Sequence, residues 1–185
     1  MNRLQANICL LAATLCWSSE VVIFSVIPGF TDVRPVCLLQ PVYGIFFGPP
    51  GCLAFAFGNF IADVASDSLR WSSIAGYIGN FVYCYLMYLA WVRLARKGFN
   101  LRTGRGILAF IGTVVAFACV QSLIITPAVA LIYPEVDFAL FAITVVANSS
   151  LFAIGLAIPG IILFQEELGM MPYKQEPAGE LPDAR

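Results

Sequence analysis

The chain has 185 residues, of which 60% are hydrophobic and 11% are charged, and its formal net charge is −1. So few charged residues leave too little polar surface to cover a soluble globule, which indicates a protein that lies in a lipid bilayer. The length gives room for about six helices of the ~20 residues needed to cross the hydrocarbon core.

The first apolar stretch, Leu4 to Pro28, contains one charged residue, Glu20. It is longer than the core of a secretory signal and lacks a small-residue cleavage site, so we expect a retained membrane helix. A polar segment, GFTDVRP at residues 29–35, follows and contains Asp32 and Arg34. This segment is expected to be the first loop.

Two shorter apolar runs, Val36 to Phe47 and Cys52 to Ala65, flank the sequence GPPG at residues 48–51. Proline and glycine together force a turn there. The two runs are either short tilted helices or a re-entrant pair, which other helices would have to shield from lipid. Both alternatives return the chain to the same side of the membrane.

Three later stretches contain no charge and are each long enough to cross the membrane: Ser72 to Trp91, Gly106 to Tyr133 and Phe138 to Phe164. We therefore predict an all-α integral membrane protein, a compact bundle of six transmembrane helices, with residues 1–167 as a single transmembrane domain. Residues 168–185 are rich in Pro and Glu and lack a periodic apolar face, so we expect a disordered cytoplasmic tail.

Half of the ten Lys and Arg residues lie in one short connection, WVRLARKGFNLRTGRG at residues 91–106. They are Arg93, Arg96, Lys97, Arg102 and Arg105. Short loops rich in positive charge stay in the cytoplasm. Counting the segments from this loop places both termini in the cytoplasm, so we expect a multi-pass protein of the inner (plasma) membrane of a bacterial cell.

Polar side chains of several segments fall at the same depth, towards the outer side. A charged side chain near the bilayer centre costs about 2.5–3.5 kcal/mol, so Glu20 and Asp63 should face a bundle interior or water. Alternatively, Asp63 reaches headgroup water or pairs with Arg70. Each Asn would then only form a hydrogen bond between two helices, which stabilises their contact by ~0.6 kcal/mol. The polar residues at this level are Glu20, Asn59, Asp63, Tyr77, Asn80, Gln121, Thr126, Thr144 and Asn148. Their gathering predicts an outward-facing pocket.

Residues for catalysis or metal binding are scarce in this sequence. It has no histidine, and its six cysteines are scattered singly without a CxxC pair, so we expect no metal site, no disulfide framework and no cofactor. Asp63 and Asp67 lie one helical turn apart, whereas an aspartyl dyad needs carboxylates that converge from separate elements. No phosphate-binding loop is present, so any energy source must be another subunit. We expect no catalytic residues and no nucleic-acid partner.

The order of several motifs along the chain carries a family resemblance. They are IPGFTDVRP, then FGPPG followed by GNFIAD, then GYIGNF, and finally NSSLFAIG. In this order they resemble the substrate-binding S components of energy-coupling factor (ECF) vitamin transporters. The similarity covers nearly the whole membrane region, and it implies an S-component-like bundle.

The resemblance also implies a function and partners. An S component captures a vitamin-like micronutrient from outside and delivers it inward together with a transmembrane coupling subunit and two ATPase subunits. The family lines its pocket with the first loop and the outer parts of the fourth to sixth helices. In this chain these positions are Asp32, Arg34, Tyr77, Asn80, Gln121 and Asn148.

The coupling subunit docks, in this family, on an AxxxA pair of the first helix. The nearest equivalents in this chain are Cys9 with Ala13 and Ala12 with Cys16, in which cysteine replaces one alanine. Because cysteine is also small, it can take the place of alanine at such a contact. The replacement leaves open a variant partner or a relative that acts without the standard module.

Two other classes of function remain open. One is a small intramembrane enzyme that uses Glu20 and Asp63, and the other is a non-catalytic structural or assembly membrane protein. The identity of a transported substrate is also open. Arg34 would suit a carboxylate or phosphate, the two acidic residues a cationic ring, and Tyr77 a flat ring.

Overall fold

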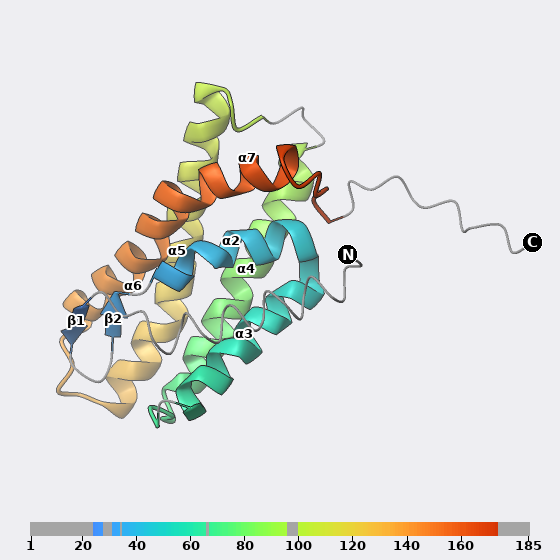
Figure 1. Cartoon of the computed structure of the whole chain (residues 1–185). Coiled ribbons are helices and arrows are strands. Elements are labelled where there is room, and N and C mark those ends of the chain that lie inside the picture. Colours follow the sequence, from blue (N-terminus) through green and yellow to red (C-terminus); the bar gives the residue numbers. More distant parts are fainter. Residues whose placement is uncertain (1–23, 28–30, 34, 66, 96–99, 174–185) are drawn as a thin grey trace, which may run out of the picture.

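The computed structural model describes residues 24–27, 31–33, 35–65, 67–95 and 100–173. This part of the chain is almost entirely helical. Its four long helical stretches are Pro35–Ala65, Ser73–Ala95, Gly104–Ile132 and Phe138–Glu166. Figure 1 shows them packed side by side in one bundle.

The first helical stretch bends back on itself, as the GPPG sequence predicted. It consists of the 3₁₀ helix η1 (Pro35–Leu38), α2 (Leu39–Val42), the π-helical turn η2 (Tyr43–Phe47) and α3 (Gly48–Ala65). The rings of Tyr43 and Phe55 lie 5.5 Å apart. Twelve residues of straight helix would separate them by about 18 Å, so the chain must reverse between them. Figure 1 shows α2 and α3 as two arms that meet in a turn.

Gly48 makes this reversal possible. Its φ is +61° and its ψ is −151°, a backbone conformation that is essentially restricted to glycine. Next to the turn, Gly44 lies so close to the backbone of α4 that a Cβ there would overlap the carbonyl oxygen of Cys84. These two glycines, four residues apart, therefore have different uses, because Gly48 permits the turn and Gly44 permits close helix contact.

The helix α4 (Ser73–Ala95) lies inside the bundle, between α3 and α5. Tyr83, Cys84 and Met87 on this helix are buried. Although it has 23 residues, α4 is not among the helices that are apolar enough to span a membrane, because its four tyrosines and Asn80 lower its hydropathy. The neighbouring helices α3 and α5 cover much of the polar surface of α4.

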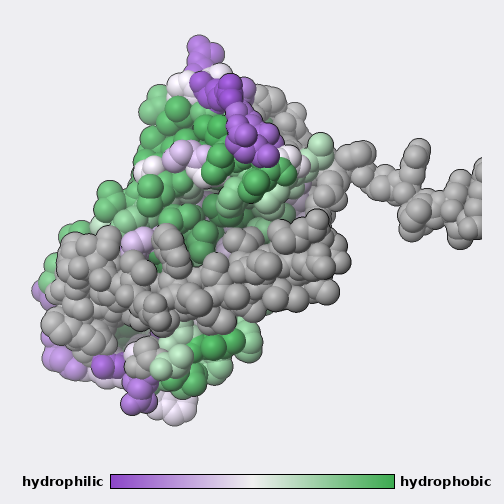
Figure 2. All heavy atoms as spheres, viewed as in Figure 1, coloured by the Kyte–Doolittle hydropathy of each residue, from purple (hydrophilic) through white to green (hydrophobic). Residues whose placement is uncertain are grey.

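The last two stretches have caps at their starts and apolar surfaces. Thr103 caps α5 (Gly104–Ile132) by accepting a hydrogen bond from the backbone of Gly106, and Asp137 caps α6 (Phe138–Phe152) in the same way. The chain continues through the π-helical turn η3 (Ala153–Ala157) into α7 (Ile158–Glu166). Large apolar side chains that point out of the bundle include Leu108, Leu123, Leu131, Ile143 and Leu151. Figure 2 shows apolar residues on the coloured surface between two hydrophilic ends.

Three described stretches are long and apolar enough to cross a membrane: Pro35–Ala65, Gly104–Ile132 and Phe138–Glu166. The prediction of a mainly helical membrane protein agrees with them. The count of six helices does not, because the described residues contain four long helical stretches. Two of the six predicted segments are the arms of the single bent stretch, and most of the predicted first helix lies outside the described residues.

The prediction that the first helix extends to Pro28 is wrong. Phe24–Ile27 form the strand β1, which pairs antiparallel with β2 (Thr31–Val33). Ile27 precedes Pro28, and a residue before proline is disfavoured in the α conformation. The prediction that the chain is all-α therefore fails at this small hairpin. Glu20 and the docking candidates Cys9, Ala12, Ala13 and Cys16 lie outside the described residues.

The two ends of the bundle are formed by different segments of the chain. At one end, an ion pair between Arg102 and Glu166 joins the chain before α5 to the end of α7. Residues 168–173, which were expected to belong to a disordered tail, pack against this end, where the backbone N–H of Tyr173 donates to the carbonyl oxygen of Ile45 over 2.9 Å. The opposite end contains the connections before α4 and before α6 and the hairpin (Figure 1).

Candidate functional site

A cavity of about 260 Å³ lies in the half of the bundle away from Arg102. Its wall comes from η1 and α2, from α3 from Phe55 onward, from the connection before α4 and the start of α4, from the second half of α5, and from α6 between Phe141 and Ser149. Five residues that the sequence placed at one level all line it: Asn59, Asp63, Asn80, Gln121 and Asn148. The expected gathering of polar groups is therefore present.

Hydrogen-bonded amides form the inner wall of the cavity. Gln40 Nε2 and Gln121 Nε2 both donate to Asn80 Oδ1, each over 2.8 Å. The hydroxyl of Ser149 donates to Gln121 Oε1 over 2.6 Å. These hydrogen bonds join α2, α4, α5 and α6. They also show which donor and acceptor atoms of each amide are already engaged in a hydrogen bond within the protein.

Two polar atoms of these bonded amides have no hydrogen-bond partner among the described residues. Gln40 is 1% exposed, and its Oε1 accepts no hydrogen bond from any residue that the structure describes. Within the described part of the chain, Asn80 Nδ2 makes none either, since both bonds of Asn80 involve its oxygen. A buried polar atom without a partner costs about 1–3 kcal/mol. A water molecule or a ligand that reaches these atoms would remove that cost.

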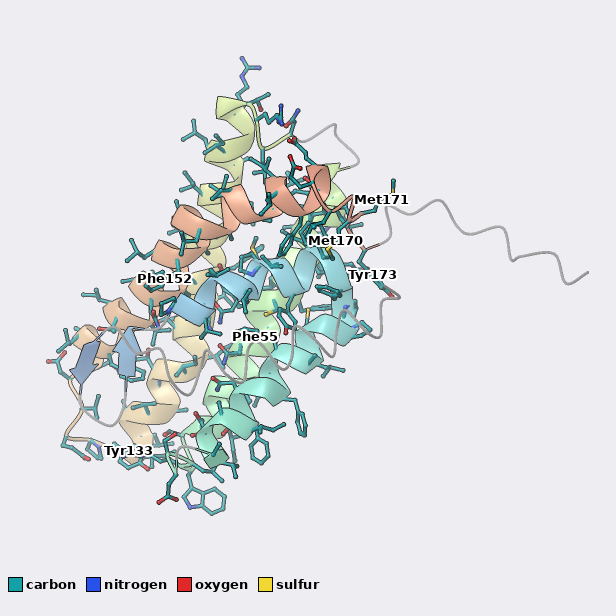
Figure 3. The ribbon with its side chains drawn as sticks, viewed as in Figure 1. Phe55, Tyr133, Phe152, Met170, Met171 and Tyr173 are labelled. Atoms are coloured by element: carbon teal, nitrogen blue, oxygen red, sulfur yellow. The ribbon has the colours of Figure 1, made fainter. Side chains whose placement is uncertain are left out.

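Charged residues lie nearer the end of the bundle. Asp63 lines the cavity and accepts a hydrogen bond from the Tyr77 hydroxyl over 3.0 Å. Arg70 lines it as well, and its guanidinium carbon lies 6.0 Å from the centre of the Tyr133 ring. Tyr133 is at the lower end of the molecule in Figure 3. Asp63 is the one carboxylate among the described residues of the wall.

Apolar side chains complete the wall. Phe55 contributes from α3, at the centre of the view in Figure 3, and Ile125 and Phe141 contribute from α5 and α6. Gly76 also lines the cavity, and a Cβ on it would meet nothing within 4 Å. A Cβ on Gly79, by contrast, would crowd Ile125. Gly76 therefore faces empty space, and a larger side chain at that position has room to enter the cavity.

Other predicted site residues lie elsewhere. Tyr77 does not line the cavity itself but contacts it through Asp63. Thr126 and Thr144 are buried in helix contacts, where the former lies 3.1 Å from the Ser122 hydroxyl and the latter donates to the carbonyl oxygen of Leu140. The backbone of Asp32 belongs to β2, paired with Ser25. Glu20 and Arg34 lie outside the described residues.

Gln40 and Ser149 are wall residues that the sequence analysis missed. Gln40 is the one amide in the run from Val36 to Phe47, so a search for isolated polar residues in apolar segments would have found it. Ser149 follows Asn148 directly, and nothing in the sequence separates it from Ser150. Ser150 is also buried, but it does not line the cavity.

The arrangement suits noncovalent binding of a small molecule. Ligand pockets combine apolar surface with convergent polar groups, and this wall contains both, although polar side chains make up more of it than is usual. Among the described residues there is no group of three or more His, Cys, Asp or Glu side chains that could hold a metal ion. No family model, curated protein or solved structure matches the chain.

Proposed function

We propose that this chain is the substrate-capture subunit of an ECF-type importer. It binds a small, vitamin-like micronutrient from outside the cell and delivers it inward together with a transmembrane coupling subunit and two ATPase subunits. The observation that carries the proposal is the amide-lined cavity at one end of an apolar helical bundle. The motif order described above supports the choice of family.

The position of the cavity supports the direction of transport. Arg93, Arg102 and Arg105 lie at the end of the bundle opposite the cavity, and Arg-rich connections face the cytoplasm. With the chain in this orientation, the cavity is on the outer side. A solute can then reach the amides from outside, while the packed half of the bundle separates it from the cytoplasm.

The chain's own residues account for capture. Gln40 and Asn80 offer hydrogen bonds to a solute that has given up its bonds to water, and Phe55 and Phe141 cover its apolar surface. The hairpin precedes η1, and β2 contacts α6 beside the wall. In the family the first loop closes over the ligand, and the β1–β2 hairpin is in the corresponding position. Release into the cell then requires reorientation against the coupling subunit.

The test is affinity purification of the tagged chain from its native membranes, followed by mass spectrometry of the proteins and small molecules that accompany it. We expect a coupling subunit, ATPases and one small molecule. Gly76→Phe should remove the small molecule while the protein partners remain, because the new ring takes space in the cavity that the ligand needs. The matched control is Gly112→Phe, at a glycine on the exposed side of α5 that also has free space.

The outcomes separate the three classes of function. Recovery of neither partners nor a small molecule would overturn the transporter proposal and favour a structural protein. A chemical change in the bound molecule that Asp63→Asn abolishes would favour the intramembrane enzyme instead. Loss of the small molecule from Gly112→Phe as strongly as from Gly76→Phe would show that the cavity is not where it binds.

A further inference from the structure

We infer that the ligand of this cavity is a small neutral molecule with an amide or lactam edge, in which an N–H donor lies next to a C=O acceptor. This inference rests on the proposed function and adds the chemical class of the substrate. It comes from three observations: the unused atoms of two amides, the balance of charge along the wall, and the volume.

The unused atoms form a complementary pair. Gln40 and Asn80 are already joined by one N–H···O bond of 2.8 Å, which uses the donor of the first and the acceptor of the second. The remaining atoms are an acceptor, Gln40 Oε1, and a donor, Asn80 Nδ2. Since these atoms belong to two amides in direct contact, a ligand amide can donate to one and accept from the other. A carboxylate lacks the donor, and an amidinium lacks the acceptor.

The charge along the wall favours a neutral molecule. The amide part contains no charged side chain among the described residues, and near the end of the bundle Asp63 and Arg70 contribute one charge of each sign. An ion without a counter-charge is far more costly to bury than a neutral polar group. An anion or a cation next to Asn80 would therefore have no partner of opposite charge there.

The volume indicates the size of the part of the molecule that the cavity can hold. At ~30 Å³ for each water molecule, 260 Å³ holds about nine waters. A ligand that fills the same space has roughly nine to twelve non-hydrogen atoms, which is one substituted ring. Phe55 and Phe141 provide apolar contacts in the wall for such a ring.

Three probes of the same shape test the inference: benzamide, benzoate and benzamidine. Each has a phenyl ring and a planar three-atom group, but at neutral pH their charges are zero, negative and positive. We would measure their binding to the purified full chain in detergent by ligand-observed NMR, with Gly76→Phe to identify binding in the cavity. Benzamide should bind about tenfold tighter than either ion, as expected for one lost hydrogen bond to a buried amide.

A single substitution should change this preference. Asn80→Asp keeps an oxygen that accepts from Gln40 and Gln121 but replaces the free N–H donor by a second oxygen with negative charge. Benzamide should then lose about tenfold in affinity, and benzamidine should become the preferred probe. The matched control is Asn100→Asp, at an exposed residue outside the cavity, where the probe order should stay as in the wild type.

The inference is overturned if benzamide does not bind in the cavity of the wild type, or if benzoate or benzamidine binds there more tightly. The wild-type comparison decides this even if Asn80→Asp does not fold. The proposed function would then still stand if Gly76→Phe removes a co-purified small molecule. It would fall as well if that substitution removes nothing.

Discussion

The two halves of the bundle differ in how they fill their interior. The half near Arg102 is packed with large apolar side chains, among them Phe46, Met87, Phe110 and Ile161, all of them at most 2% exposed. The other half encloses the cavity and lines it with amides and serines. Protein interiors are normally close-packed, and a void forfeits contacts on one side. The difference indicates that the packed half provides stability and the hollow half provides binding.

Tyr173, which follows the last helix in the chain, contributes further contacts to the packed half. Its ring lies against Gly48 and 5.7 Å from the ring of Tyr88, centre to centre, while its backbone N–H bonds to Ile45. The segment after α7 thus covers the turn between α2 and α3. That turn joins the packed half to α3, which continues to the cavity.

The largest effect on stability should come from Gly44→Ala. The added methyl group overlaps the backbone oxygen of Cys84, which no side-chain rotation can relieve. We expect a loss of about 3 kcal/mol or more in the free energy of unfolding, measured in detergent with denaturant. Gly112→Ala is the control, because its methyl group meets nothing within 4 Å and should be neutral or slightly stabilising. Equal stability of the two variants would contradict the close contact between η2 and α4.

A smaller loss, about 1–3 kcal/mol, should follow Gly48→Ala, because alanine strongly disfavours this backbone conformation. The methyl group would also crowd the Tyr173 ring. In the background of Tyr173→Ala the same substitution should cost less, and a double-mutant cycle measures the difference. Strict additivity would mean that Tyr173 does not press on the turn.

The smallest effect should come from Arg102→Ala. Its ion pair with Glu166 is well exposed, with 63% and 43% of the two side chains accessible, and such pairs contribute about 0–1 kcal/mol. We expect a slight, salt-dependent fall in melting temperature and unchanged probe binding. A marked loss of benzamide affinity in this variant would show that the packed half and the cavity are coupled.

Much of the helical layout was predictable from the sequence. The three charge-free stretches correspond to α4, α5 and the α6–α7 stretch within a few residues at each end, because apolar length alone identifies them. The GPPG sequence predicted the reversal at Gly48, since only a few residue types permit it. The hairpin at Phe24–Ile27 was missed because its apolar residues are equally compatible with the end of a helix.

The site was predictable in part. The common depth of Asn59, Asp63, Asn80, Gln121 and Asn148 followed from counting residues along spanning segments. Which of these residues bond to one another did not follow, since it depends on helix rotation and on close approach at particular glycines. Gln40 in particular reaches the cavity because α2 is only one short arm of a bent stretch.

The most direct test of the central claim is native mass spectrometry of the gently purified chain, which counts bound small molecules per protein. We expect about one bound molecule per wild-type chain, the same number for Gly112→Phe and none for Gly76→Phe. Equal occupancy of Gly76→Phe and the wild type would contradict it, as would a wild-type chain that never binds a small molecule, whether as purified or after incubation with benzamide.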